Sequence, residues 1–197
     1  MLSRAIVPRH RHDELADAIA KVMQGIRIGH SDAPDTQLGP VAMKRQLERV
    51  EEYVALGRAS ADLVTGGNRP AHMNSGYFIE PTLFANVDNK SRIAQEEIFG
   101  PVLCLIPADD EEDAIRIAND SAFGLNGSVL TNDADAAYRI GRRIRAGGFG
   151  QNGMKMEFGL PFGGFKQSGI GREGGVEGLH AYLETKTMLL DATPSGF

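Results

Sequence analysis

One thiol is available in this sequence for nucleophilic chemistry, the side chain of Cys104. It lies within residues 102–106, Val-Leu-Cys-Leu-Ile, which form an apolar run. A reactive cysteine needs an electropositive and partly exposed setting that holds the thiolate, and an apolar strand provides the opposite. We therefore predict that Cys104 is a buried thiol of the hydrophobic core. A single cysteine also excludes an internal disulfide, and with it a disulfide-stabilised secreted scaffold.

Metal ligands are not grouped in this sequence, because its five histidines are scattered. His10 and His12 lie in a basic segment, where only Asp13 and Glu14 follow as further ligands. We interpret this segment as solvated surface and expect no metal site. The arginines of residues 139–145 could capture an anion, but favourable charge at a helix C-terminus is the simpler interpretation.

Residues 148–153, Gly-Phe-Gly-Gln-Asn-Gly, match the pattern GxGxxG, and Glu173 lies twenty residues beyond Gly153. The dinucleotide-binding fingerprint requires a helix that opens at these glycines. Pro161 stands soon after and disfavours a long helix there. The match is therefore not interpreted as a dinucleotide-binding motif.

Two adjacent carboxylates open residues 96–101, Glu-Glu-Ile-Phe-Gly-Pro. A carboxylate there could accept hydrogen bonds from sugar hydroxyls, and the ring of Phe99 could pack on a flat heterocycle. Taken without context, a surface turn explains the same residues. Residues 161–173 leave a similar choice, since their glycines and two phenyl rings fit either a tight packing crossover or a loop that walls a pocket.

The whole chain has the composition of an ordinary globular protein, with 197 residues, 42% hydrophobic and 24% charged. Its net charge of −5 gives no reason to expect a nucleic-acid partner. The longest aliphatic run falls far short of the about 20 residues that span a membrane. The N-terminus has no apolar stretch of signal-peptide length, so we expect no membrane association and a cytoplasmic protein. Thirteen of the 24 glycines lie between Gly141 and Gly178.

Alternating strand and helix patterns predict an α/β domain with a largely parallel sheet flanked by helices. Asp109 is expected to cap the helix that ends near Asn119, together with Glu112, and Gly147 to end the helix over residues 133–145. We expect a domain over residues 1–178 and a separate tail over 179–197. The predicted strands are residues 4–7, 62–65, 76–84, 102–106, 125–130 and 183–190. The predicted helices are residues 13–27, 41–61, 109–119, 133–145 and 175–181.

Several of these segments together resemble motifs of the aldehyde dehydrogenase superfamily. The resemblance runs in order from about residue 3 to residue 189, and several independent motifs carry it. The matching segments are residues 76–82, 96–101, 123–125, 161–169 and 182–187.

The resemblance implies a catalytic-domain portion that begins just after the nucleophilic cysteine of the family. The general-base glutamate, the oxyanion asparagine and most cofactor contacts would then also fall outside these residues. Cys104 is no substitute, because it lies in the strand after the Glu-Glu-Ile-Phe-Gly-Pro motif.

For the cofactor, the resemblance implies that Glu97 accepts hydrogen bonds from the nicotinamide ribose and that Phe99 packs near the nicotinamide. The cofactor would be NAD or NADP, with weak or no binding by these residues alone. Phe162, Phe158 and Met154 would line the aldehyde tunnel. Glu173 would lie near the general base and support it by contact or by proton relay.

The implied activity is oxidation of an aldehyde to a carboxylic acid, through a covalent intermediate on a thiol. These 197 residues alone are expected to be inactive. Two alternatives stay open: a non-catalytic fragment or pseudoenzyme that only folds and associates, and one half of a split enzyme completed by a separate N-terminal chain. Lys186 and its strand resemble a segment that pairs with a neighbouring subunit, so a homo-oligomer through residues 183–190 is expected.

Overall fold

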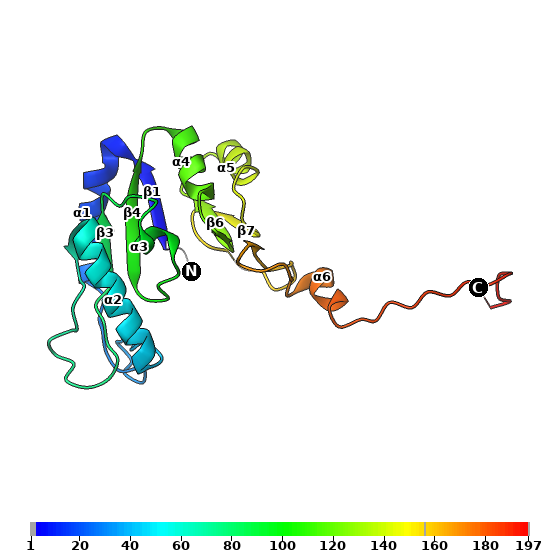
Figure 1. The fold of residues 1–197 in the computed structure, drawn as a ribbon, viewed down its shortest axis with the longest axis horizontal. Helices are drawn as coiled ribbons and strands as arrows, with labels where there is room; N and C mark the ends of the chain where they lie inside the picture. The colour runs from blue at the N-terminus through cyan, green and yellow to red at the C-terminus, as the bar shows by residue number, and fades with distance from the viewer. Residues whose placement is uncertain (1–2, 156, 197) are drawn as a thin grey trace.

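A four-stranded sheet forms the centre of the computed structural model, which describes residues 3–155 and 157–196. The strand order is β1-β4-β3-β2, and Figure 1 shows helices on both sides of this sheet. The pairs β1·β4 and β3·β4 are parallel, whereas β2 runs antiparallel to β3 at one edge. The strands are β1 (Arg4–Pro8), β2 (Asp62–Thr65), β3 (Thr82–Ala85) and β4 (Val102–Ala108). The predicted α/β class with a mostly parallel sheet is confirmed.

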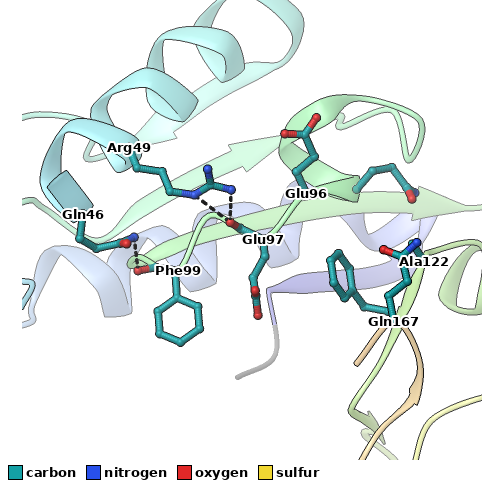
Figure 2. A pocket seen from close by; sticks show the side chains of 9 residues that line it. Gln46, Arg49, Glu96, Glu97, Phe99, Ala122 and Gln167 are labelled. Carbon is teal, nitrogen blue, oxygen red and sulfur yellow. Dashed lines mark hydrogen bonds between the residues drawn. The ribbon is translucent and has the colours of Figure 1, made fainter. Parts of the chain in front are cut away.

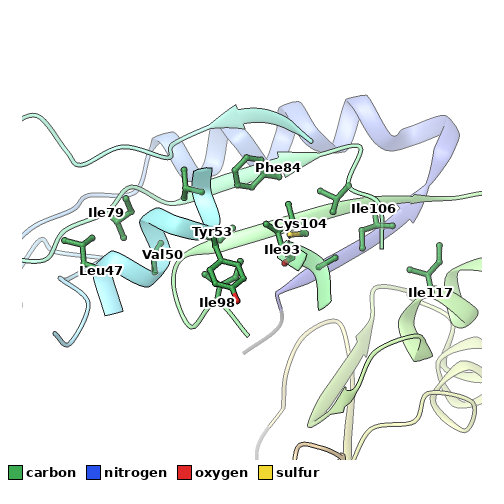
Figure 3. Close-up of a cluster of buried hydrophobic side chains, with 14 of the residues drawn as sticks. Leu47, Val50, Tyr53, Ile79, Phe84, Ile93, Ile98, Cys104, Ile106 and Ile117 are labelled. Atoms are coloured by element: carbon green, nitrogen blue, oxygen red, sulfur yellow. Dashed lines mark hydrogen bonds between the residues drawn. The ribbon is translucent and has the colours of Figure 1, made fainter. Parts of the chain in front are cut away.

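Alternation along β3 and β4 sends successive side chains to opposite faces of the sheet. Leu83 and Leu105 pack with Ala16 and Ala20 of α1 (His12–Gln24). Phe84 and Cys104 face the other way, into the larger cluster drawn in Figure 3. That cluster is covered by α2 (Lys44–Ser60), α3 (Arg92–Gln95) and α4 (Glu111–Asn119). Both faces are therefore buried, which explains why residues 102–106 are apolar throughout.

Asp110, and not Asp109, caps α4 by accepting a hydrogen bond from the Asp113 N–H at 2.8 Å. The predicted cap was one residue early, and Asp109 instead pairs with Arg9 at 2.6 Å. Likewise α5 (Ala134–Gly141) ends before the expected boundary, and Gly147 is not its stop. A Cβ at Gly147 would lie 1.7 Å from the Gly163 carbonyl oxygen, so this glycine serves a close backbone approach.

The expectation that His12 lies on the solvated surface was wrong. His12 is the first residue of α1 and is only 4% exposed. Its Nε2 accepts the Asn86 N–H at 3.2 Å, and its Nδ1 lies 2.9 Å from the Asp13 carboxylate. The ring is buried because it satisfies the backbone at the turn after β3.

The predicted strand over residues 76–84 is much shorter in the structure. Pairing with β4 begins only at Thr82, directly after Pro81. The preceding residues form a loop, in which the Tyr77 carbonyl accepts the Val41 N–H at 3.0 Å.

Two small sheets and a short helix complete the described chain. The remaining elements are η1 (Arg9–Arg11), β5 (Phe123–Gly124), β6 (Asn126–Val129), β7 (Gly148–Gln151), β8 (Phe165–Lys166) and α6 (Gly175–His180). β5 pairs antiparallel with β8, and β6 pairs parallel with β7. Within the described residues, 183–190 form no strand, contrary to expectation, and Figure 1 shows them leading away from the sheet. An extended segment becomes a strand only beside another backbone edge.

Helices of the described residues include none that is long and apolar enough to cross a membrane.

Candidate functional site

A cavity of about 590 Å³ opens where α2, the loop before β4 and the β5 region meet. Figure 2 shows the side chains around it. The loop of residues 96–99 forms one wall, which is the segment that the sequence singled out for sugar and heterocycle contacts. The lining residues are Gln46, Arg49, Gln95, Glu96, Glu97, Phe99, Ala122, Phe123 and Gln167.

Glu97 is held by its backbone and not by its side chain. Its carbonyl oxygen accepts two hydrogen bonds from Arg49, from Nε at 3.0 Å and from Nη2 at 2.6 Å. Among the described residues, none donates a hydrogen bond to its carboxylate. Figure 2 shows this carboxylate pointing away from Arg49. The acceptor oxygens of Glu97 therefore remain available to a ligand that carries hydroxyl donors.

Phe99 presents an exposed ring on an unusual backbone. Its side chain is 75% exposed and its φ is +60°, a left-handed conformation that is rare for a bulky residue. Gln46 Nε2 donates to the carbonyl oxygens of Ile98 and Phe99, both at 2.8 Å. The ring is thus directed to solvent at the cavity by a loop that α2 supports.

The carboxylate of Glu96, unlike that of Glu97, is bound by other side chains of the protein. Arg92 donates to its two carboxylate oxygens, at 2.7 Å from Nε and 3.0 Å from Nη2. The Tyr53 hydroxyl donates to the same carboxylate. The hydrogen bonds from Arg92 and then from Tyr53 lower the pKa of Glu96 to about 2. Glu96 therefore stays ionised and engaged within the protein, and of the two adjacent carboxylates only Glu97 is open.

Cys104 lies in the core, as its sequence context predicted. It is 1% exposed, and its Sγ donates to the Ile93 carbonyl at 3.3 Å. Burial raises its pKa to about 12. A thiol in this state is neither ionised nor reachable at neutral pH, so it is not a nucleophile.

The glycine-rich segment forms a tight crossover and also contributes Gln167 to the cavity wall, so both of its interpretations apply. Phe162 and Glu173 exchange backbone hydrogen bonds, each at 2.7 Å. A Cβ at Gly163 would lie 2.3 Å from the Gly171 carbonyl oxygen, so the two backbone segments of the crossover pack directly against each other.

The other predicted site residues do not lie at the cavity around Glu97. Phe158 is 87% exposed and Met154 is 47% exposed. Phe162 and Glu173 pair with each other in the crossover and do not line the cavity, whereas Gln167 of the same segment does. Their substrate-tunnel and proton-relay roles stay predictions.

The cavity residues on α2 were not predicted from the sequence. Gln46 and Arg49 are three residues apart, so they occupy one face of the helix. A polar helix face was visible in the sequence, but it is also the pattern of any solvated surface, so it gave no specific signal.

The GxGxxG match does not form a dinucleotide-binding motif. Its residues 148–151 form β7, and no helix opens at its glycines. No group of three or more metal-ligating side chains occurs in residues 3–155 and 157–196.

The aldehyde dehydrogenase family model matches residues 1–188. The match covers most of the chain, and the chain belongs to this family. A geranial dehydrogenase from Castellaniella defragrans is 44% identical over 188 residues, which are 95% of this chain and 39% of that protein. A 3-succinoylsemialdehyde-pyridine dehydrogenase from a Pseudomonas species is 42% identical, over 95% of this chain and 40% of its own length.

Solved structures agree in fold. An aldehyde dehydrogenase from Mycobacterium tuberculosis, crystallised with NAD+, has a TM-score of 0.93 and 48% identity over 99% of this chain and 40% of its own. One from Pseudomonas syringae, complexed with NAD+ and octanal, has a TM-score of 0.91 and 43% identity, over 93% of this chain and 38% of its own. The chain spans about two fifths of the length of the relatives that it matches.

Proposed function

We propose that this chain is a catalytic-domain portion of an NAD(P)-dependent aldehyde dehydrogenase, which oxidises an aldehyde to a carboxylic acid. Membership of the family supports the reaction class. The relatives named above include proteins solved with NAD+, which supports the cofactor class.

One observation carries the cofactor part of the proposal. The Glu97 carboxylate has no hydrogen-bond donor among the described residues, although the Glu97 carbonyl is held by Arg49. A ribose offers paired hydroxyl donors that such a carboxylate can accept. The exposed ring of Phe99, two residues on, offers a flat apolar surface to the adjoining heterocycle. These residues therefore fit the nicotinamide-ribose end of the cofactor.

When bound, the cofactor supplies the hydride acceptor of the oxidation. Glu97 would orient the ribose and Phe99 would shield one side of the ring. Phe162, Phe158 and Met154 are proposed to line the path of the aldehyde. Glu173 is proposed to support the general base of the complete site, by proton relay or by orientation.

The 197 residues on their own are proposed to be inactive. Their only thiol is Cys104, which is buried and protonated. Cofactor affinity would also be weak, because Glu97 and Phe99 contact only one end of a dinucleotide and ordering costs oppose binding. We also propose a cytoplasmic setting. Two alternatives to this proposal are one half of a split enzyme, completed by a separate N-terminal chain, and a non-catalytic module that only folds and associates.

Self-association is proposed through residues 183–190. Among the large side chains exposed there, Met188 is 67%, Leu189 is 92% and Leu190 is 60% exposed. Apolar surface of this kind marks an interaction site. A two-fold homodimer is the simplest assembly.

An activity assay tests the proposal. The pure chain is mixed with NAD+ or NADP+ and a panel of aldehydes, and reduced cofactor is followed by absorbance. We expect no turnover by the chain alone. Turnover that Cys104→Ser abolishes would overturn the assignment of that thiol to the core.

A further inference from the structure

We propose that Arg49 and Gln46 are positioning residues, which set the backbone of residues 97–99 so that the Glu97 carboxylate and the Phe99 ring are arranged before a ligand arrives. The identity of that ligand rests on the proposed function, whereas the positioning itself rests on the contacts of the loop.

Three consecutive carbonyl groups of this loop are bound by one helix. Arg49 binds the carbonyl oxygen of Glu97 with two N–H groups. Gln46 binds the next two carbonyl oxygens, those of Ile98 and Phe99. In a regular strand, successive carbonyls point to opposite sides. The loop therefore has an irregular conformation, and α2 satisfies its backbone acceptors (Figure 2).

The hydrogen bonds from α2 explain how Phe99 keeps its left-handed backbone conformation. A bulky residue keeps a positive φ only where its surroundings over-determine it, and such strain is concentrated at ligand sites. Ile98 is buried beside it, at 6% exposure. A Cβ at Gly100 would lie 2.4 Å from Val50 Cγ2, so the loop rests directly on α2. Ile98 and Gly100 provide the apolar anchor, and Gln46 and Arg49 provide the polar one.

Arg49 is itself held in place, although it lies at the surface. Its guanidinium carbon is 4.7 Å from the centre of the Tyr53 ring, and its Nη2 is 3.1 Å from the Tyr53 oxygen. Tyr53 is 1% exposed and also donates to Glu96. An exposed arginine is ordinarily mobile, and this stacking fixes it over the Glu97 carbonyl.

Backbone order of the loop provides the direct test. ¹⁵N relaxation of the 197-residue chain is compared for the wild type, Arg49→Ala and the matched control Arg45→Ala. Arg45 is exposed on the same helix, and among the described residues it makes no side-chain hydrogen bond or ion pair. We expect backbone order parameters of about 0.85 for residues 97–99 in the wild type and the control, and below about 0.6 in Arg49→Ala. A wild-type loop that is already flexible, or an Arg49→Ala loop that stays ordered, would overturn the proposal.

A titration with NAD+ separates the hydrogen-bond geometry of the Arg49 guanidinium from its charge. If the wild type binds, we expect at least about fivefold weaker binding in Arg49→Ala, and no recovery in Arg49→Lys, because lysine restores the charge but not the two-pronged hydrogen bond. Full recovery in Arg49→Lys without recovery of loop order would show that only the charge matters and would contradict positioning. If the wild type gives no response at residues 97–99, the proposed function fails there, while the relaxation comparison still decides the positioning role.

Discussion

The Tyr53 hydroxyl donates a hydrogen bond to the Glu96 carboxylate, and this contact joins the hydrophobic core to the loop that carries Glu97. Tyr53 is packed on the core face of α2, at 1% exposure (Figure 3). Arg92 binds the same carboxylate from α3. The adjacent glutamates thus divide two tasks, since Glu96 holds the loop and Glu97 faces the cavity.

Removing the Tyr53 hydroxyl tests whether Glu96 holds the loop. We predict that Tyr53→Phe lowers the free energy of unfolding by about 1–3 kcal/mol at pH 7, because a hydrogen bond to a charged acceptor is lost. It should also raise the pKa of Glu96 from about 2, since Tyr53 is one cause of its depression. Urea unfolding measures the first quantity, and carboxyl NMR titration measures the second.

The contribution of Glu96 to the free energy of unfolding should depend on pH in one direction. The Glu96 pKa is depressed in the folded chain, so its contribution is complete above the ordinary value of 4.5 and is lost as the pH falls toward about 2. The stability difference between wild type and Tyr53→Phe should therefore shrink over that range. Tyr182→Phe is the control, because Tyr182 is 87% exposed. Equal losses in both variants would contradict the role given to Tyr53.

The core thiol is predicted to be inert. With a pKa of about 12, only about one thiol in 10⁴ is ionised at pH 8, and burial blocks access to it. A disulfide reagent should react with Cys104 in urea and fail to react with the folded chain over hours. Rapid labelling of the folded chain would place the thiol at the surface.

Alkaline unfolding checks the same residue. The pKa of the Cys104 thiol is raised in the folded chain. Its contribution to the free energy of unfolding is therefore complete below the ordinary pKa of 9.0 and is lost as the pH rises toward about 12. Cys104→Ala should cost about 1–2 kcal/mol at pH 8, by removal of a packed group. At pH 10 the difference from wild type should be smaller. A difference that grows with pH would contradict the assignment.

The sheet and the helices that cover it were predicted from the sequence, because buried strands and helices place apolar residues at characteristic positions. Residues 102–106 are apolar because α1 covers Leu105 while α2 and α3 cover Cys104. The placement of His12 was not predictable, since its burial depends on the backbone of Asn86, 74 residues away. Residues 183–190 have strand-forming character, but the described residues give them no pairing edge.

The site was predictable only in part, because some of its contacts join residues that are far apart in the sequence. The adjacent carboxylates of residues 96–101 were visible as a motif, and Glu97 and Phe99 do lie at one cavity. Their different roles are set by Arg92, Tyr53 and Arg49. Arg92 and Glu96 are four residues apart, so their pairing follows from local spacing. Tyr53 and Arg49 reach the loop through tertiary contacts, which no spacing rule in the sequence predicts.

Close packing of the loop on α2 gives a further prediction. Gly100→Ala should destabilise the chain by about 1–3 kcal/mol, because the new methyl group would overlap Val50. Gly171→Ala is the matched control, since a Cβ there meets no atom within 4 Å. Thermal unfolding compares the two. A Gly100→Ala variant as stable as Gly171→Ala would show that the loop does not rest on the helix.

Association should depend on the tail. We predict that the intact chain is oligomeric at tens of micromolar and that a chain ending at Tyr182 is less so, because the apolar residues of 183–190 are removed. Light scattering measures both. A monomeric intact chain would contradict the prediction, and an oligomer that survives truncation would remove the tail as its cause.

The assignment of Glu97 to the cofactor is tested most directly by NMR titration of the ¹⁵N-labelled chain with NAD+. We predict weak binding, in the millimolar range, with shift changes centred on Glu97 and Phe99. Glu97→Gln should lose most of this response, whereas Glu157→Gln, a change at an exposed carboxylate away from the cavity, should retain it. Shift changes centred elsewhere, or an undiminished response in Glu97→Gln, would contradict the account.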